Sequence, residues 1–311
     1  MDLLKALEAI RTPFLSDLFS VLTYLGAKEV MIVVGFTTLW CIDKRWGYRI
    51  CYVGMAGTIF NQWLKVIFSI PRPWVQDPGF TIVESAREAA DGYSFPSGHT
   101  QTAASLFGTI ATAAKRRKGA AALCAILILL TAFSRVYLGV HTLLDVGVSL
   151  FSGLLTVAVL TLLFERAKNN RTVDLWLWIG LLAFVLAELF YVLLAPKPPS
   201  AIPEFELESL ENAFTMTGTV LGMLLIRFVD RRYLKFETRA VWWIQIIKCF
   251  FGFALLLLIM VLTKTPFLLL FKGHSVSNLF RYFLVVASGG ILWPMTFPLL
   301  SRLGAKAKPP V

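Results

Sequence analysis

Long apolar segments, separated by short polar connections, follow one another from about residue 28 to residue 300 of this chain. Most of them are long enough to form a helix that crosses a hydrocarbon core of about 30 Å. Alternating strands of about ten residues, which typify a transmembrane barrel, are not seen. The pattern therefore predicts an all-α, polytopic membrane protein. We expect nine spans, at about residues 28–43, 50–70, 98–114, 119–140, 142–164, 174–195, 209–226, 240–263 and 279–300.

The first 27 residues differ from the rest because they mix charged and apolar residues over a short stretch. They lack the clean apolar core of a cleavable signal peptide, and we interpret residues 1–27 as an N-terminal interfacial helix. Four apolar residues are expected to dip towards lipid: Phe14, Leu15, Leu18 and Phe19. The remaining chain divides into a core at 28–164, which carries the polar motifs described below, and a four-helix membrane extension at 165–311.

The composition agrees with a membrane protein. The chain is 57% hydrophobic and only 16% charged, with a mean hydropathy of +0.70. A soluble domain of this length carries more charge. The four cysteines form no CxxC motif and no Cys/His cluster, so the sequence suggests neither a zinc site nor a disulfide framework.

Basic residues are distributed unevenly between the connections. The formal net charge of +11 would suit nucleic acid, but eighteen of the 30 lysines and arginines fall in alternate connections. The positive-inside rule places those connections, and with them the C-terminus, in the cytoplasm, where they meet lipid headgroups rather than nucleic acid. They contain Lys44, Arg45, Arg49, "KRRK" at 115–118, Arg166, Lys168, Arg171, Arg227, Arg231, Arg232, Lys235, Arg239, Arg302, Lys306 and Lys308. The N-terminus and the loops 71–97, 195–208 and 264–278 then face the opposite side.

Three polar motifs fall on that opposite side. They are "KVIFSIPRP" at 65–73, "PSGH" at 96–99 and "SRVYLGVHTLLD" at 134–145. Taken singly, each has an ordinary explanation. Lys65 could extend its amine to the headgroups, Ser97 could cap a helix, and Arg135 could be an interface residue.

Together the motifs are specific, because Lys-x6-Arg-Pro, Pro-Ser-Gly-His and Ser-Arg-x5-His-x3-Asp specify eleven residues in order. This set resembles the signature of the type-2 phosphatidate phosphatase (PAP2) superfamily, which also includes vanadium haloperoxidases and glucose-6-phosphatases. The matching residues cover 65–145, less than a third of the chain.

The residue types suit a phosphomonoester, which carries nearly two negative charges. Lys65 and Arg72 are seven residues apart, about two helical turns, so both can point the same way if the helix continues. The prolines on either side of Arg72 are expected to end the helix and to place Arg72 at a stiff corner. Arg135 adds a second planar guanidinium that matches phosphate oxygens. Ser97 has a hydroxyl to donate. The backbone N–H groups of Gly98 and His99 are expected at a helix N-terminus, where anions bind well.

The two histidines of the motifs are expected to have different tasks. His141 and Asp145 are four residues apart, so on a helix they would share a face and could hydrogen bond. The resemblance implies that His141 attacks phosphorus and forms a phosphohistidine while Asp145 orients its ring. It also implies that His99 protonates the leaving oxygen and later activates water. Lys65, Arg72, Ser97, Gly98 and Arg135 would hold the phosphate oxygens.

The resemblance further implies that neither a metal nor another cofactor takes part, and no carboxylate cluster accompanies the three motifs. The expected substrate is an amphiphilic phosphate of a lipid, because a site at headgroup depth admits a molecule that diffuses within the bilayer. The oligomeric state is left open.

Three alternatives remain. The nine-span layout and the phrase "LKVIFSIPRPW" are similar to glucose-6-phosphatase, which would make a sugar phosphate the substrate. A transporter could use Lys65, Arg72, Arg135 and the intramembrane Glu188, although the nine segments show no internal repeat. A phosphate-binding protein without turnover would lack a catalytic residue, and none is missing. Outside the motifs, Lys248 is expected to extend to the headgroups, and His274 to lie in an exposed loop.

Overall fold

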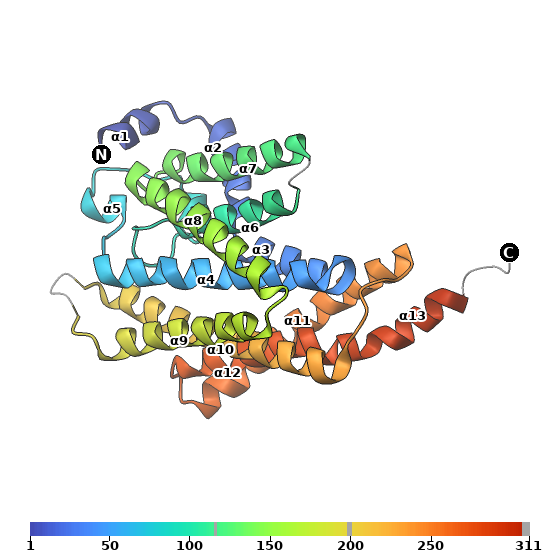
Figure 1. The fold of residues 1–311 in the computed structure, drawn as a ribbon. Helices are drawn as coiled ribbons and strands as arrows, with labels where there is room; N and C mark the ends of the chain where they lie inside the picture. The colour runs from blue at the N-terminus through green and yellow to red at the C-terminus, as the bar shows by residue number, and fades with distance from the viewer. Residues whose placement is uncertain (115–116, 198–200, 307–311) are drawn as a thin grey trace. The chain divides into compact units, whose positions relative to one another are not determined.

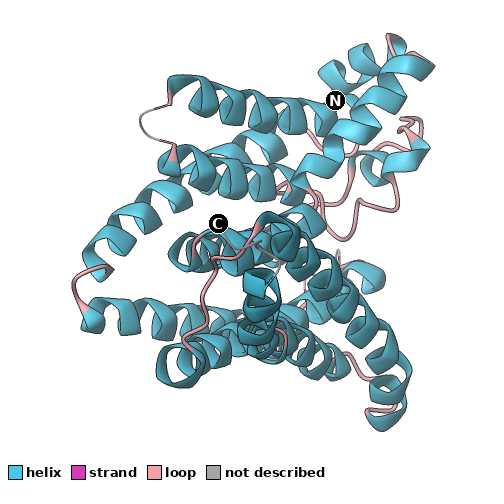
Figure 2. Ribbon diagram, turned by 90° about the vertical axis from the view of Figure 1, so that its right-hand side faces the viewer, coloured by secondary structure: helices cyan, strands magenta, loops and turns pink. Residues whose placement is uncertain are grey.

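The computed structural model describes residues 1–114, 117–197 and 201–306, and every regular element in these residues is helical (Figure 2). The α-helices, labelled in Figure 1, are α1 Asp2–Ala9, α2 Pro13–Thr23, α3 Lys28–Thr37, α4 Lys44–Phe68, α5 Pro73–Gln76, α6 Gly98–Ala113, α7 Lys118–Tyr137, α8 Leu143–Ala167, α9 Arg171–Leu194, α10 Pro203–Val229, α11 Trp242–Leu270, α12 Val276–Ala287 and α13 Phe297–Lys306. Short 3₁₀ and π segments extend several of them. The all-α expectation is confirmed.

The expectation of nine spans is not confirmed. Among the described residues, six helical segments are long and apolar enough to cross a membrane, or seven if Pro13–Gly26 and Lys28–Ile42, which meet at a bend of 48°, form one span. Helix α6 has 16 residues and is too short. Helix α4 has 25 residues, but polar side chains such as Asn61, Gln62 and Lys65 interrupt its apolar character.

The chain forms two compact units. The first comprises Met1–Ile32, Tyr52–Leu177 and Phe190–Leu210, and the second comprises Val33–Cys51, Trp178–Leu189 and the chain from Glu211 onward. The three-part division expected from the sequence remains a prediction.

In the first unit, α6, α7 and α8 pack side by side (Figure 1). Small residues let α6 and α8 approach closely, since a Cβ placed on Gly153 would come within 2.7 Å of the Cβ of Ala104. The N-terminal ends of α6 and α8 carry two of the three polar motifs, so their packing draws these motifs together.

The N-terminal segment differs from the single interfacial helix expected. Two helices form because Thr12 caps α2 with its hydroxyl and Pro13 occupies the first helical position. The ring of Phe19 packs on that of Tyr137, with centroids 4.6 Å apart, and Leu15 joins the same cluster. Phe14 and Leu18 are exposed, so only half of the expected lipid-facing set faces outward.

In the second unit, two buried charged groups, Asp230 and Lys248, have identified partners. Lys44 Nζ lies 2.6 Å from Asp230 Oδ1, and the hydroxyl of Tyr48 donates to the same carboxylate. Lys248 is fully buried, donating to Thr238 O and lying over the ring of Phe297, so the expectation that it reaches the headgroups is wrong. Glu188 is buried and His274 is exposed.

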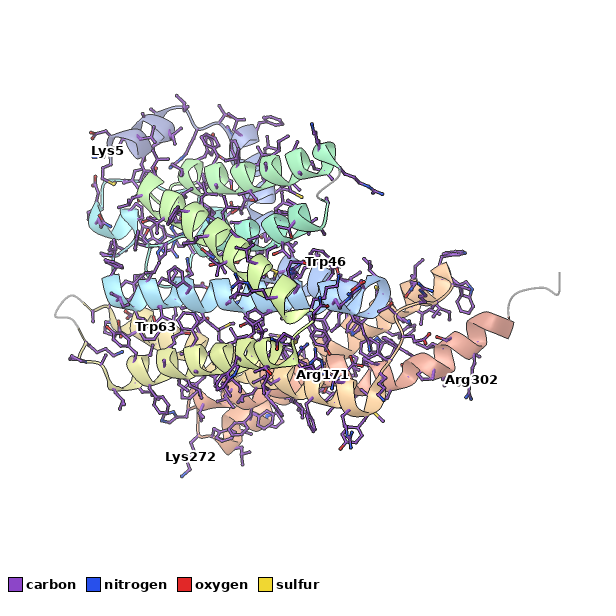
Figure 3. All side chains as sticks on the ribbon, in the orientation of Figure 1. Lys5, Trp46, Trp63, Arg171, Lys272 and Arg302 are labelled. Carbon is purple, nitrogen blue, oxygen red and sulfur yellow. The ribbon has the colours of Figure 1, made fainter. Side chains whose placement is uncertain are left out.

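Some basic residues that were expected to mark the cytoplasmic side cannot be placed. Lys115, Arg116 and Lys308 lie outside the described residues, as do residues 198–200 of the loop 195–208. Arg302 is exposed and projects from α13 (Figure 3).

Candidate active site

Lys65 lies in the last turn of α4, where its side chain is buried. Its amine donates to the carbonyl oxygen of Tyr93 and, at 3.5 Å, to that of Asp91. The helix ends at Phe68, and Ser69 adopts a left-handed φ of 45°. The helix therefore ends before Arg72, as the two prolines beside this residue predict, and the chain turns sharply between Lys65 and Arg72.

Arg72 is almost completely buried just before the short helix α5. Its guanidinium donates to Asp91 O at 2.6 Å, to Gly92 O at 2.9 Å and to Val140 O at 3.0 Å, and lies 2.9 Å from Nε2 of His141. Burial lowers the pKa of Arg72 to about 10, while Asp145 and Asp91 oppose that shift. The side chain therefore stays cationic at neutral pH.

The contact with Arg72 determines the tautomer of His141. A guanidinium has only N–H donors, so Nε2 of His141 must carry the lone pair. The ring proton is then on Nδ1, which lies 3.4 Å from Oδ2 of Asp145. Burial, reinforced by Arg72 and Arg135, lowers the pKa of His141 well below its usual value. The imidazole is therefore neutral at pH 7, with a lone pair directed at a buried cation.

Asp145 approaches His141 by a route that differs from the expected one. His141 precedes the helix, because α8 begins at Leu143 with Thr142 as its N-cap. Asp145 Oδ2 accepts from the backbone N–H of Thr142 at 2.8 Å and from the hydroxyl of Ser94 at 2.7 Å, while the Thr142 hydroxyl accepts from Asp145 N. This capping box holds the carboxylate in one position beside the imidazole.

Ser94 and Thr142 were not among the candidates from the sequence. The Thr-x-x-Asp pattern at 142–145 is a signal that would have identified the capping box. Ser94 has no such signal, because it lies 51 residues before its partner.

Ser97, Gly98 and His99 lie at the start of α6. The Ser97 hydroxyl oxygen caps the helix by accepting from the backbone and side chain of Thr100, and Ser97 N donates to Asp145 O at 3.2 Å. Within the described residues, the N–H groups of Gly98 and His99 donate to no protein acceptor. They are oriented by the first turn of the helix and are available to an anion.

Arg135 is fully buried near the end of α7. Its guanidinium donates to the hydroxyl of Thr23, at 2.9 Å, and to Ala89 O, at 3.4 Å, while Nε makes no hydrogen bond within the described residues. Thr23 could not be identified from the sequence, since 112 residues separate it from Arg135. His99 lies within electrostatic reach of Arg135, His141, Arg72 and Lys65.

The three motifs therefore meet in the first compact unit. Direct contacts join Arg72 to His141 and Ser97 to Asp145, and the carbonyl of Asp91 joins Lys65 to Arg72. The described residues contain no group of three or more His, Cys, Asp or Glu side chains that could hold a metal ion. The arrangement concentrates three buried cations around a neutral imidazole, which is the environment that a bound dianion requires.

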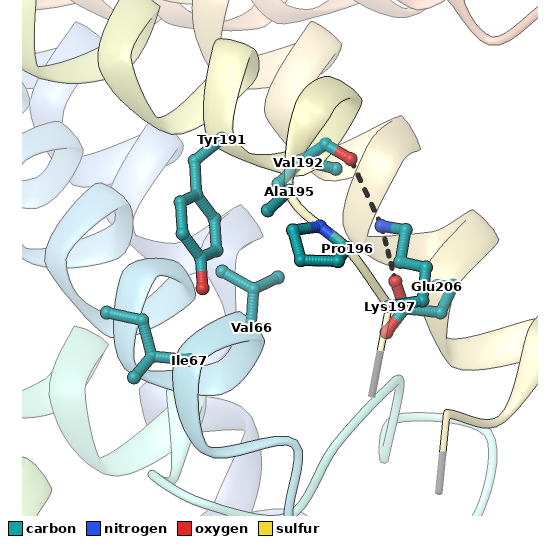
Figure 4. Close-up of a pocket in the computed structure, with 8 residues that line it drawn as sticks. All are labelled: Val66, Ile67, Tyr191, Val192, Ala195, Pro196, Lys197 and Glu206. Carbon is teal, nitrogen blue, oxygen red and sulfur yellow. Dashed lines mark hydrogen bonds and ion pairs between the residues drawn. The ribbon is translucent and has the colours of Figure 1, made fainter. Parts of the chain in front are cut away.

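A pocket of about 150 Å³ lies at the end of α4, where Val66 and Ile67 form one of its walls (Figure 4). The end of α9 and the segment after it form the other wall. Lys197, in this segment, donates to Val192 O at 3.0 Å and forms an ion pair with Glu206 Oε2 at 2.5 Å.

Comparison with known proteins agrees with these motifs. Residues 46–169 match the family model described as PAP2 superfamily, and residues 214–306 match one described as PAP2 superfamily phosphatase, transmembrane extension. Phosphatidylglycerophosphatase B of Bacillus subtilis (strain 168) is 30% identical over 179 residues, which are 54% of this chain and 84% of that protein. Undecaprenyl-diphosphatase BcrC of the same organism is 34% identical over 116 residues, 37% of this chain and 54% of that protein.

Among solved structures, the chain is similar to the crystal structure of a transmembrane PAP2 type phosphatidylglycerolphosphate phosphatase from Bacillus subtilis. The identity is 25%, the TM-score is 0.44, and the match covers 54% of this chain and 86% of the other. The identity and coverage of the first sequence relative, together with the two family models, show that this chain belongs to the PAP2 superfamily and is a multi-pass membrane phosphatase.

Proposed function

We propose that the protein removes a phosphate group from a lipid phosphomonoester or diphosphate by way of a phosphohistidine, without a metal ion. The observation that carries this proposal is the contact between the Arg72 guanidinium and the unprotonated Nε2 of His141, surrounded by further buried cations. Two relatives, a phosphatidylglycerophosphatase and an undecaprenyl-diphosphatase, support a lipid substrate.

In the proposed first step, the substrate phosphate displaces His141 as the partner of Arg72. The lone pair on Nε2 attacks phosphorus, an N–P bond forms, and the bond to the leaving oxygen breaks. His99, whose imidazolium form the negative charge of the bound phosphate favours, gives its proton to that oxygen and becomes neutral. Asp145 stabilises the positive charge that develops on the His141 ring.

In the proposed second step, His99 takes a proton from water and the hydroxide attacks phosphorus. The N–P bond breaks and its electron pair returns to Nε2 of His141. Inorganic phosphate then leaves the site. Throughout, the negative oxygens are held by Lys65, Arg72, Arg135, the Ser97 hydroxyl and the N–H groups at the start of α6.

We also propose that this site faces the extracytoplasmic side and that the C-terminus is cytoplasmic. The support is the positive-inside rule, because the basic connections alternate with those that carry the three motifs.

The test is phosphate release by purified protein from a panel of substrates, with His141→Ala as the blank. The panel contains phosphatidylglycerophosphate, phosphatidic acid, a prenyl diphosphate, a sphingoid phosphate and glucose 6-phosphate. We expect hydrolysis of at least one lipid, no loss of activity with EDTA, and inhibition by vanadate, which resembles the five-coordinate transition state. Release from glucose 6-phosphate alone, or activity that EDTA abolishes and Mg²⁺ restores, would contradict the proposal.

A further inference from the structure

The short loop strip Asp91–Tyr93 holds two of the site's cations through its backbone. The carbonyl oxygens of Asp91 and Gly92 accept from Arg72, and those of Asp91 and Tyr93 accept from Lys65. The positions of both cations therefore depend on where this strip lies, because two side chains from different elements are hydrogen bonded to the same three residues.

The same strip is held from another direction by the segment that begins α10. The hydroxyl of Tyr93 donates to Glu206 Oε1 at 2.8 Å and accepts from Ile202 N at 3.4 Å. The Tyr93 ring packs edge-on against Phe205, with centroids 5.3 Å apart. Burial, followed by the bond to Glu206, raises the pKa of Tyr93, so the hydroxyl remains a donor.

Glu206 is itself fixed from the opposite side. Its second carboxylate oxygen pairs with Lys197 at 2.5 Å, and Lys197 in turn donates to Val192 O at the end of α9 (Figure 4). A series of polar contacts through Lys197 and Glu206 therefore connects the end of α9 to Tyr93. The backbone carbonyl of Tyr93 in turn accepts a hydrogen bond from Lys65.

Glu208 adds a contact at the centre of the strip. Gly92 has a left-handed φ of 61°, and a Cβ at this position would come within 3.2 Å of Glu208 Oε2. That oxygen is buried and makes no hydrogen bond within the described residues. The Glu208 carboxylate lies within electrostatic reach of both Lys65 and Arg72.

We propose that the first two turns of α10 position the two phosphate-binding cations by holding the strip Asp91–Tyr93 in place. Glu206 acts through the hydroxyl of Tyr93, and Glu208 acts through Gly92 and through its charge. Both residues lie between the two segments that match the family models, 46–169 and 214–306. This inference rests on the proposed function, since it assumes that Lys65 and Arg72 bind phosphate.

The physical reason is the precision that phosphoryl transfer requires. A displacement of about 1 Å in a positioned group can cost about 10²-fold in rate. If the strip Asp91–Tyr93 loses its contacts with Glu206 and Glu208, its carbonyl oxygens can move. Lys65 and Arg72 can then shift by about 1 Å while α4, α6 and α8 stay packed. The expected result is weaker binding of the transition state in a protein that remains folded.

The experiment compares Tyr93→Phe, Glu206→Gln and Glu208→Gln with Glu204→Gln, which changes an exposed carboxylate in the same helical turn. Each variant is assayed for kcat/KM on a hydrolysed lipid phosphate, for vanadate inhibition and for melting temperature. We expect kcat/KM to fall about 10- to 100-fold in the three test variants, with a parallel rise in the vanadate inhibition constant. The Glu204→Gln control keeps wild-type values.

A double variant makes the test sharper. Tyr93→Phe removes the donor of one hydrogen bond, and Glu206→Gln weakens the same bond by replacing its charged acceptor with an amide oxygen. The double variant should therefore lose no more than the larger single loss. Fully additive losses would show that the two residues act separately, and would overturn the proposed route.

The outcomes separate this inference from the proposed function. A wild-type protein that hydrolyses none of the phosphorylated lipids contradicts the proposed function. An active, vanadate-sensitive wild type with test variants equal to the control overturns only the inference. A loss of activity that follows the folded fraction, with an unchanged vanadate inhibition constant, shows a purely structural role and also overturns it.

Discussion

The two compact units bury charge in different ways. In the second unit, Lys44 and Asp230 form a close ion pair that Tyr48 completes, and Lys248 is satisfied by a carbonyl and an aromatic ring. In the first unit, Lys65, Arg72 and Arg135 are buried, and the carboxylate of their motifs, Asp145, already accepts from Ser94 and Thr142.

The difference shows how a structural charge is distinguished from a binding charge. Burying an ion is costly unless a counter-charge accompanies it. In the second unit Asp230 supplies the counter-charge of Lys44, whereas in the first unit the cations of the three motifs are held by backbone carbonyls, a threonine hydroxyl and a histidine lone pair. In the proposed function, the substrate phosphate supplies the missing negative charge. We therefore expect substitutions in the first unit to change catalysis and those in the second to change stability.

The largest effect is expected from His141→Ala. Removing the attacking nitrogen should reduce kcat by at least about 10³-fold, while inorganic phosphate still binds because the cations remain. Phosphate release and calorimetric phosphate binding measure the two properties. His274→Ala, which changes an exposed histidine outside the motifs, is the matched control. Turnover retained in His141→Ala would exclude this residue as the nucleophile.

A smaller but large effect is expected from Arg72→Lys. Lysine keeps the charge but lacks the planar set of N–H donors. The Arg72 guanidinium uses these donors to bond the carbonyl oxygens of Asp91, Gly92 and Val140 and to contact Nε2 of His141. We expect kcat/KM to fall about 10²-fold, measured on the preferred lipid. Arg87→Lys, at an exposed arginine paired with Glu84, should leave the rate unchanged. Equal rates in the two variants would mean that charge alone suffices at position 72.

The smallest catalytic effect is expected in the second unit. Asp230→Asn leaves the Lys44 amine without its counter-charge and should lower the free energy of unfolding by about 2 kcal/mol. Thermal unfolding in detergent measures that loss. The kcat/KM of the folded fraction should stay near the wild-type value. A tenfold loss of kcat/KM with an unchanged melting temperature would erase the distinction between the two units.

The sequence predicted which motif residues lie close together better than it predicted the local structure around them, and their catalytic roles remain predictions. The i, i+4 spacing brought His141 and Asp145 together correctly, but the contact is made across a helix N-terminus rather than along a helix. The prolines beside Arg72 predicted that the helix ends before this residue, but not that the chain turns at Ser69 or that the side chains of Lys65 and Arg72 meet at the strip 91–93. Spacing limits which residues can meet, and several backbone geometries satisfy one spacing.

Hydropathy alone established that the chain is helical and embedded in a membrane, because a backbone in lipid must satisfy its own hydrogen bonds. The order of the three motifs predicted the superfamily, which the family models and the first sequence relative confirm. Only the tertiary structure decided the partners of each charge: Thr23 for Arg135, the strip Asp91–Tyr93 for Lys65 and Arg72, and Glu206 for Tyr93. These partners lie 19 to 113 residues apart in the chain. Local patterns extend over only a few turns, so contacts at such separations arise from the packing of whole helices.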